Sequence, residues 1–442
     1  MYATEVLAAY IDTFRHQPLS DEVVHHAKRA VIDWYASLFP GLASPVVGLL
    51  ERALAEDIDR GDAKLGSGRR ATARTAALIN GTAAHAAEVD DSYREAMYHP
   101  GAATIAAALA AGQQARASGS QFLRGVILGY EVSTRIGVVL GRPHYRFWHN
   151  TGTVGTFGAA AAAGGILELG APAFAHALAT AATFAAGLQQ AFRMDSMSKP
   201  LHAGRAAEAG LLAATLAGQG VTGSLDVLDG ESGLGQAMST GPDWSQIGAT
   251  LGRDFHIGRL TFKNHIGCGH TFAAIDGALA LQRKHGLAAS DIETVRVATY
   301  RPALDIACYE RPTTANEARF SLHYVVASAL VHGSVRLAAY EPARLDDRDT
   351  RNLMERITVA VDPEIDAAFP GQRAARIEIG TLDGRRLSYF QPNRKGDPEE
   401  PLTDEELEDK LIELASPQIG LEAARSLLAR LWSLDRAAAL DW

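Results

Sequence analysis

Two neighbouring carboxylates and a histidine form the first group of residues that could do chemistry. Asp90 and Asp91 lie in the run Glu88-Val89-Asp90-Asp91-Ser92, and His99 begins the motif His99-Pro100-Gly101. Adjacent carboxylates raise each other's proton affinity, and an imidazole titrates near neutrality, so this group could move protons. A solvated helix end followed by a packed histidine fits the same letters and is the better interpretation without other support.

Cations gather in the segment Ser196-Met197-Ser198-Lys199-Pro200-Leu201-His202-Ala203-Gly204-Arg205. Lysine is rare, with seven in 442 residues, yet Lys199 falls where an alanine-rich helix is expected to begin. Three potential cations there predict a receptor for carboxylates, because free amides and the helix dipole add to their charge. The letters also contain Ser-x-x-Lys, a motif of β-lactamase-like serine hydrolases, but the accompanying Ser-Asp-Asn and Lys-Thr-Gly motifs are missing from the sequence.

Three further segments combine histidine with aromatic or basic residues. They are Pro143–Asn150, Lys263–His270 and Arg319–Tyr324. The second lies where helical patterning gives way to strands, and ligand clefts are common at such domain junctions. Its single cysteine and two histidines do not match the spacing of a zinc site, and we predict no metal. Taken singly, each segment is more typical of packing than of catalysis.

Composition excludes several classes of protein. Lys plus Arg number 42 and Asp plus Glu 51, so the formal charge is −9 and no basic face for nucleic acid is expected. Only Cys268 and Cys308 are present, too few for a disulfide framework, which favours a reducing, cytoplasmic location. The segment Gly66–Ala71 imitates a dinucleotide-binding loop, but no strand is expected before it and no βαβ unit after it.

No membrane segment is expected. The first twenty residues carry charges and lack the apolar run of a signal peptide. The stretches Thr151–Leu167 and Ala171–Phe192 are built mainly from small residues such as Ala, Gly and Thr, whose transfer into lipid is poor. We interpret both as central helices of a soluble protein.

The patterning predicts a mainly α protein with a large all-helical domain plus a smaller α+β lid domain. Alanine-rich tracts indicate helices up to about residue 241, because alanine loses no rotamer freedom in a helix. Alternating runs predict strands at 293–300, 356–361, 374–380 and 385–390, the last two forming a hairpin, with helices around 320–333 and 346–355. Residues 391–410 are polar, and helical patterning resumes after Lys410. We therefore assign 1–260, rejoined by 395–442, to the helical domain and 261–394 to the lid.

In their order, these segments resemble the MmgE/PrpD family, which includes 2-methylcitrate dehydratase, cis-aconitate decarboxylase and iminodisuccinate epimerase. The resemblance runs from about Asn80 to Tyr324 and weakly to the C-terminus. It rests on NGTAAHAAEVDDSY followed by HPG, GYEVSTRIG, HNTGTVGTFGAAAAAGGILELG, SMSKPLHAGRAAEAGLLAA, CGHTFAAIDGALAL and ARFSLHYVVASAL. The resemblance implies a helical domain with an α+β lid, a homodimer, and no metal or organic cofactor.

The resemblance also implies which residues form the active site. By motif correspondence these are Asp90, Asp91, His99, His149, Lys199, His202, His270 and Tyr324. The common chemistry of the family is removal of a proton, or of carbon dioxide, next to a carboxylate of a small polycarboxylic acid. We predict His99 as the base, assisted by Asp91 or Asp90, with Tyr324 or His149 as proton donor.

A local cationic pocket must overcome the repulsion between a polycarboxylate and a protein of charge −9. We expect Lys199, Arg205 and Lys263 to supply its positive charge. The residues assigned to substrate binding are Tyr145, His202, Arg205, Lys263 and His270.

The sequence does not determine the identity of the substrate, because three motifs differ from those of methylcitrate-processing members of the family. The family's Phe-Asp-Asp-Thr is here Val89-Asp90-Asp91-Ser92, its His-Pro-Thr is His149-Asn150-Thr151, and its Tyr-Pro-Ser-Cys is His265-Ile266-Gly267-Cys268. We therefore predict a dehydratase-type lyase, with an epimerase or a cis-aconitate-type decarboxylase as alternatives. A serine hydrolase or a non-catalytic binding protein are the alternatives from other classes.

Overall fold

The chain forms two compact units in a computed structural model that describes residues 1–192, 194, 196–369 and 371–440. The helical unit comprises 1–261 and 403–442, and the sheet unit comprises 262–402. The second structural boundary lies beyond the expected 394/395, because residues 395–402 still belong to the sheet unit. The prediction of a mainly α protein with a smaller α+β part is confirmed.

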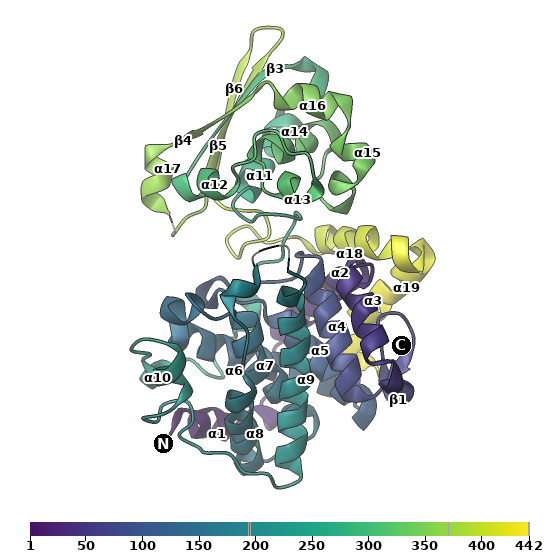
Figure 1. Ribbon diagram of the computed structural model, residues 1–442, viewed down its shortest axis with the longest axis vertical. Helices are drawn as coiled ribbons and strands as arrows, with labels where there is room; N and C mark the ends of the chain where they lie inside the picture. Colours follow the sequence, from purple (N-terminus) through teal and green to yellow (C-terminus); the bar gives the residue numbers. More distant parts are fainter. Residues whose placement is uncertain (193, 195, 370, 441–442) are drawn as a thin grey trace. The chain divides into compact units, whose positions relative to one another are not determined.

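The helical unit is built from helices that bury small residues. Its helices are α1 (Ala3–His16), α2 (Asp21–Leu42), α3 (Pro45–Ala53), α4 (Ala73–Ala86), α5 (Pro100–Ala115), α6 (Gly119–Tyr145), α7 (Asn150–Ile166), α8 (Ala171–Phe184), α9 (Ser198–Gly218), α10 (Leu234–Met238), α18 (Asp404–Ile419) and α19 (Leu421–Trp432). Helix α7 is buried along almost its whole length and packs against α5, α6 and α9 (Figure 1). Alanine and glycine allow these backbones to approach closely.

The helical unit is not all-helical as predicted, because it contains a small β-ribbon. Strand β1 (Ile58–Lys64) pairs antiparallel with β2 (Arg70–Ala71). Most of β1 is exposed, and Asp59 and Gly61 have positive φ angles of 63° and 74°. A polar, bulged strand shows no alternation of apolar and polar residues, so β1 was not predicted from the sequence. The Gly66–Ala71 segment is the turn and second strand of this ribbon, and no βαβ unit follows it.

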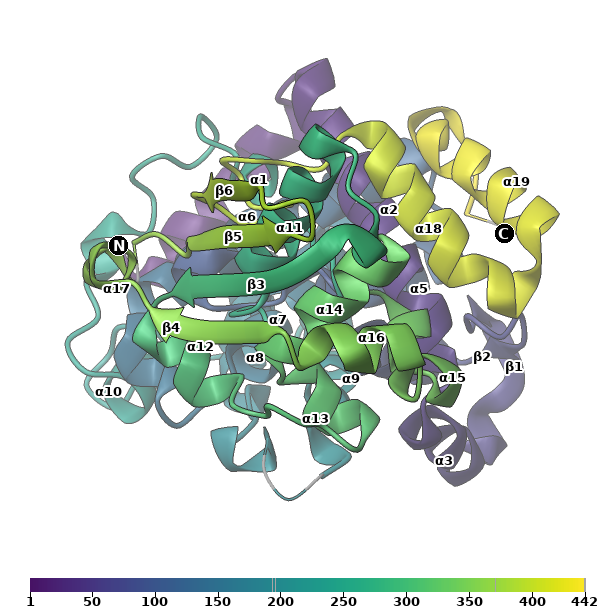
Figure 2. The same cartoon turned by 90° about the horizontal axis from the view of Figure 1, so that it is seen from above.

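The sheet unit has one four-stranded sheet with its strands in the order β4-β3-β5-β6 (Figure 2). The strands are β3 (Ile292–Thr299), β4 (Ile357–Val361), β5 (Ala375–Thr381) and β6 (Arg386–Gln391), and the helices are α11 (Phe272–His285), α12 (Arg301–Ile306), α13 (Ala315–Arg319), α14 (Leu322–His332), α15 (Pro342–Leu345), α16 (Arg348–Met354) and α17 (Pro363–Ala368). Strands β3 and β4 are parallel, whereas β3–β5 and β5–β6 are antiparallel.

The sheet is held by alternating burial. In β5 every second residue is buried, and α11 packs on β5 and β6 while α14 packs on β4. The four predicted strands, their hairpin and the helices around 320–333 and 346–355 are all present.

No single helix in the described part of the chain is long and apolar enough to cross a membrane. Helices α2 and α3 pass this test of length and composition only as a pair, with a bend of 81° between them. The stretches 151–167 and 171–192 correspond to buried α7 and to α8 followed by a short 3-10 turn, Gln189–Phe192.

Helix α18 begins earlier than predicted, at Asp404 rather than after Lys410. Thr403 and Glu406 form a capping box: the Glu406 amide donates to Thr403 Oγ1 at 3.1 Å, and the Thr403 amide donates to Glu406 Oε2 at 2.7 Å. This capping box can be recognised in the sequence, but the many charged residues around it made the segment look like a loop, and the start of α18 was missed. Helix α18 packs against α2 in both views (Figures 1 and 2).

Replacing Thr403 by alanine should lower the free energy of unfolding by about 1 kcal/mol, because the α18 amides lose their cap. Urea denaturation followed by circular dichroism measures the change. Thr403→Ser, which keeps the hydroxyl, should stay close to the wild type. Equal stability of the alanine variant and the wild type would show that the box contributes nothing.

Candidate active site

Four helix ends of the helical unit meet at a group of imidazoles, the histidine cluster, formed by His85, His99, His149 and His202. His85 is the penultimate residue of α4, His99 and His149 directly precede α5 and α7, and His202 lies near the start of α9. The His85 ring centroid is 5.0 Å from that of His99 and 5.4 Å from that of His149, and the His149 and His202 centroids are 5.3 Å apart. The helix starts contribute positive partial charge here.

The tautomer of His99 is fixed by the backbone. Its Nδ1 lies 2.8 Å from the carbonyl oxygen of Asp91. Because a carbonyl only accepts, Nδ1 carries the proton and Nε2 carries the lone pair. Asp90 Oδ2 is 3.4 Å from the same Nδ1, and the His99 side chain is 20% exposed. A partly exposed imidazole with a carboxylate behind it suits a general base.

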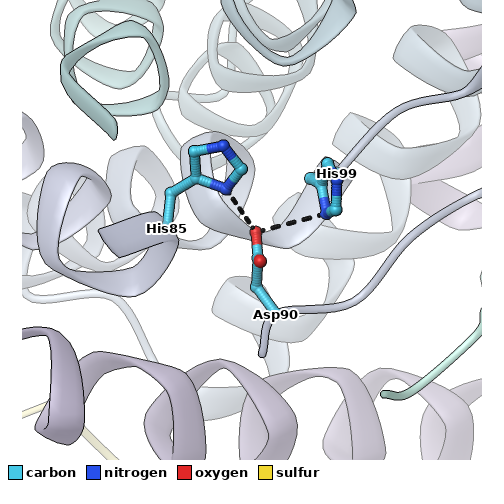
Figure 3. Close-up of side chains that lie close together, drawn as sticks. All are labelled: His85, Asp90 and His99. Atoms are coloured by element: carbon cyan, nitrogen blue, oxygen red, sulfur yellow. Dashed lines mark hydrogen bonds and ion pairs between the residues drawn. The ribbon is translucent and has the colours of Figure 1, made fainter. Parts of the chain in front are cut away.

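Asp90 contacts two histidines (Figure 3). The same Oδ2 that faces His99 accepts a hydrogen bond from His85 Nδ1 at 2.8 Å, and both side chains are almost completely buried. One nitrogen from each of His85 and His99 and one carboxylate oxygen of Asp90 lie within 4.8 Å of one another. This is the group in the described part of the chain that could hold a metal ion.

The carboxylate of Asp91, which was predicted to be catalytic, is hydrogen-bonded to Gly101 and Tyr130. Its Oδ1 accepts from the Gly101 amide at 2.9 Å, and its Oδ2 accepts from the Tyr130 hydroxyl at 2.7 Å. Burial, reinforced by the nearby Asp33 carboxylate, raises the pKa of Asp91 to about 8, so it is protonated at neutral pH. Asp91 therefore acts on His99 through its backbone carbonyl.

Gly101 completes the local explanation of the His-Pro-Gly motif. A Cβ at this position would lie 2.7 Å from Tyr130 Oη and 2.9 Å from Asp91 Oδ1. Only glycine lets the start of α5 approach these two side chains closely enough for the Gly101 amide to bind Asp91.

His149 and His202 form a second hydrogen-bonded pair, with their Nδ1 atoms 3.0 Å apart. Burial lowers the pKa of His149 well below its usual value, and nearby His85 and Lys199 lower it further. Burial and the same two neighbours also lower the pKa of His202. Both rings are therefore neutral at neutral pH, and one Nδ1 donates its proton to the other.

Lys199 brings the positive charge predicted from its position at the start of α9. Its ammonium pairs with Glu88 and lies 5.0 Å from the centroid of the Phe192 ring. Glu88 has a φ of 58°, a left-handed backbone conformation that is uncommon outside glycine and that clusters at functional sites. Lys199 is thus held next to the histidine cluster by a carboxylate that a substrate could replace.

Arg205 and Tyr145 are the other predicted substrate-binding residues of the helical unit. Arg205 pairs with Glu208, which also binds Arg74, and these three residues line a surface hollow that contains none of the cluster histidines among the described residues. Arg205 lies six residues after Lys199, which places the two side chains about 120° apart around the axis of α9. Tyr145 is the half-buried last residue of α6, and its hydroxyl makes no hydrogen bond within the described residues.

The sheet unit carries the remaining predicted residues, Lys263, His270 and Tyr324. His270 Nδ1 is 3.0 Å from the Tyr300 hydroxyl. Burial, together with Arg373 and Arg394, lowers the pKa of His270 to about 4. Lys263 is half-buried in the same loop as His270. The loop thus presents a neutral imidazole in a positively charged environment.

Tyr324 does not fit its predicted role as proton donor. The side chain is fully buried in α14, and its hydroxyl donates to the carbonyl oxygen of Ala339. Burial raises the pKa of Tyr324, which makes loss of its proton harder. The sequence identified a tyrosine at the start of a helix, but not the carbonyl that takes its hydrogen bond.

Both parts of the sequence match models of one family. Residues 5–247 match the MmgE/PrpD N-terminal domain, and residues 265–434 match the MmgE/PrpD C-terminal domain. The chain belongs to the MmgE/PrpD family. Three curated relatives resemble this MmgE/PrpD protein over 98% of its chain.

These relatives are named as cis-aconitate decarboxylases or as similar to them. The "cis-aconitate decarboxylase-like protein oryM" of Aspergillus oryzae is 27% identical, with 95% of its length covered. The cis-aconitate decarboxylases of Homo sapiens and Mus musculus are each 26% identical, with 92% and 90% of their lengths covered. The MmgE/PrpD protein therefore belongs to a family of dehydratase- and decarboxylase-type enzymes.

Sequence reasoning gave no role to several residues at these sites. They are His85, Glu88 and Phe192 in the helical unit, and Tyr300, Arg373 and Arg394 in the sheet unit. His85 lies near the end of a helix, five residues before Asp90, a spacing that could have been noticed. The three residues of the sheet unit lie far from His270 in sequence and carry no local signal.

Asp91→Asn should change how stability depends on pH. The folded pKa of about 8 exceeds the ordinary value of 3.8, so this carboxyl stabilises the fold at low pH, and that contribution is lost as pH rises from about 4 to about 8. The asparagine variant lacks this loss. The free energy of unfolding of the variant minus that of the wild type should therefore increase by up to about 1.4 kcal/mol per pH unit in this range. Urea denaturation at pH 5, 6 and 7 measures the difference, and parallel curves would contradict the raised pKa.

Proposed function

We propose that this protein is a cofactor-independent enzyme that breaks a bond next to a carboxylate in a small polycarboxylic acid. The observation that carries the proposal is the hydrogen bond from His99 Nδ1 to the Asp91 carbonyl, which makes Nε2 the basic nitrogen. The names of the relatives favour decarboxylation of a cis-aconitate-like acid. Dehydration and epimerisation, which share an enediolate as their first intermediate, are the alternatives.

His99 is the proposed base or acid at the reacting carbon. In dehydration or epimerisation, Nε2 removes a proton from the carbon next to a carboxylate, and the electron pair passes into that carboxylate as an enediolate. The ring becomes an imidazolium, which the neighbouring Asp90 carboxylate stabilises at 3.4 Å. In decarboxylation the bond to a carboxylate breaks instead, carbon dioxide leaves, and a protonated His99 returns a proton to the resulting carbanion.

Lys199 is the proposed carboxylate receptor. A substrate carboxylate would replace Glu88 as the partner of its ammonium, and the starts of α5, α7 and α9 would add their backbone dipoles. This local positive charge opposes the overall charge of −9. The strain at Glu88, with its φ of 58°, is consistent with a group that yields its partner to the substrate.

His149 is the remaining proposed proton donor, because the Tyr324 hydroxyl is engaged by Ala339. His149 is neutral at neutral pH, and its Nδ1 is linked to Nδ1 of His202, which gives a path for a proton between the two rings. Homodimer formation and a cytoplasmic location stay predictions.

The serine-hydrolase alternative gains no support from the geometry. Ser196 is exposed, and its hydroxyl oxygen accepts a hydrogen bond from the Ser198 amide. Lys199, which would have to activate that hydroxyl, pairs with Glu88. Ser196→Ala is therefore expected to leave the activity of the enzyme largely intact.

Proton NMR in deuterium oxide distinguishes the possible reactions. Incubation with cis-aconitate, methylcitrate and iminodisuccinate should show loss of a carboxyl group, formation of an alkene, or exchange of the hydrogen next to the carboxylate. His99→Gln should lower the rate by a factor of about 100 or more, as expected for loss of a general base. Asp91→Asn should keep most of the activity, because its backbone carbonyl remains.

His176→Gln is the control, because the ring of His176 in α8 is hydrogen-bonded to the backbone of Gly223, which follows α9, and not to the cluster. Wild-type protein that neither exchanges nor consumes any of a broad panel of such acids would overturn the proposal in favour of a binding protein.

A metal-assisted hydro-lyase is the second candidate, favoured by the placement of His85, Asp90 and His99. Two imidazoles and a carboxylate bind several transition metals. However, His99 Nδ1 donates its proton to the Asp91 carbonyl, so a metal would have to bind Nε2, the nitrogen that serves as the base in the proposed reaction. The residues therefore fit a proton relay better than a metal centre.

Treatment with EDTA followed by dialysis should leave the rate unchanged, while added Zn²⁺ should inhibit by binding the basic nitrogen of His99. The rate of substrate consumption before and after treatment measures this. Loss of activity on chelation, restored by one divalent metal, would establish the metal-assisted mechanism instead.

A further inference from the structure

The loop that carries Asp90 and Asp91 is anchored by a lysine more than 300 residues away. Lys410 of α18 donates from Nζ to the carbonyl oxygen of Val89 at 2.9 Å, a contact across 321 positions. The same Nζ lies 2.6 Å from Asp33 Oδ1 in α2. The side chains of Lys410 and Asp33 are 0% and 1% exposed. One of only seven lysines in the chain is thus completely buried directly behind the catalytic loop.

The other end of this loop is anchored as well. The amide of Ser92 donates to the Thr261 carbonyl at 2.9 Å, and the amide of Thr261 donates to the Ser92 carbonyl at 2.8 Å. Thr261 is the last residue of the helical unit before the chain enters the sheet unit, and α18 begins just after the chain returns. The four residues from Val89 to Ser92 are therefore clamped by the outgoing and the returning parts of the helical unit.

The two connecting segments are also paired with each other inside the sheet unit. The Phe262 amide donates to the Gly396 carbonyl at 3.0 Å. Gly396 has a φ of 98°, and a Cβ there would lie 1.9 Å from the Phe262 carbonyl oxygen. This position admits only glycine, which indicates that a close, fixed approach of the two segments is required.

A buried ion pair usually contributes little to the stability of a fold. Removing two charges from water costs several kcal/mol, and apolar replacements of such pairs are often neutral or stabilising. The charge of Asp33 also reaches the site, since it helps to raise the pKa of Asp91 and of Tyr130. A group that is costly to bury and lies this close to the catalytic loop has its best explanation in the geometry that it enforces.

We propose that Lys410 is a positioning residue for the His99 site. Its ammonium fixes the Val89 carbonyl, and so holds the Asp90 carboxylate and the Asp91 carbonyl against the His99 ring. The kinetic part of this inference rests on the proposed function, whereas its structural part does not. If the loop loosens, His99 loses the acceptor that selects its tautomer, and the rate falls while substrate binding at Lys199 persists.

The competing explanation is that Lys410 only joins α18 to α2. A matched control exists, because Arg29 of α2 pairs with Asp404 of α18 and joins the same two helices. Asp404 is six residues, or about 9 Å, along α18 from Lys410. The Arg29 side chain is 8% exposed and that of Asp404 is 43% exposed, so the control removes a buried cation from a pair that is less buried than Lys410 and Asp33. Arg29→Met thus weakens the same helix contact at a point away from the loop.

The experiment compares wild type, the double variant Lys410→Met/Asp33→Asn, and Arg29→Met. The double variant avoids an uncompensated buried carboxylate, which could prevent folding. Amide hydrogen exchange of segment 87–99, measured by mass spectrometry, should accelerate about tenfold or more in the double variant, because a charge-assisted hydrogen bond is lost. In Arg29→Met it should stay at the wild-type rate.

In the same comparison, kcat of the double variant should fall about tenfold with KM changed less than about threefold, since misplacement of a base affects the rate more than binding. Unchanged exchange of segment 87–99, or equal acceleration in Arg29→Met, would overturn the inference. If the wild type converts no acid, the proposed function fails, and the exchange comparison still decides whether Lys410 holds the loop.

Discussion

The site depends on one hydrogen bond, from Nδ1 of His99 to the backbone carbonyl of Asp91. A carbonyl cannot donate, so this bond alone decides which imidazole nitrogen is basic. It requires the loop from Val89 to Ser92 to keep its shape. Asp91 is fixed by Gly101 and Tyr130, and Ser92 by Thr261. The helices around the loop therefore serve to place a carbonyl oxygen as much as they place side chains.

Electrostatics explain why so many histidines can share one small region. Burial and neighbouring positive charge lower the pKa values of His149 and His202, so these rings are neutral and act as hydrogen-bonding groups. The ammonium of Lys199 pairs with Glu88. In the proposed mechanism a substrate carboxylate replaces Glu88 as the partner of this ammonium. Lys199 is thus the positive charge that is available to a substrate carboxylate in a protein whose net charge is negative.

The fold was largely predictable because its signals are local. Alternation identified β3 to β6, and alanine-rich tracts identified the buried helices. Strand β1 escaped because it is polar and bulged, and the start of α18 escaped although Thr403 and Glu406 mark it. The ordered motifs also sufficed to identify the family.

The site was predictable only in part, because side-chain direction depends on distant partners. The sequence identified Asp90, His99, His149, Lys199 and His202, which the structure brings together. It did not show that Tyr130 and Ala339 engage Asp91 and Tyr324. These partners lie 39 and 15 positions away, and no local pattern connects them. The role of Lys410, hundreds of residues from the loop, is the extreme case of the same limitation.

Nitrogen-15 NMR of the His99 imidazole tests the central claim most directly. His99→Gln, in otherwise identically labelled protein, assigns the two ring signals by their disappearance. At neutral pH the account predicts a proton on Nδ1 and an unprotonated, basic Nε2. A proton on Nε2, with Nδ1 as the basic nitrogen, would contradict it.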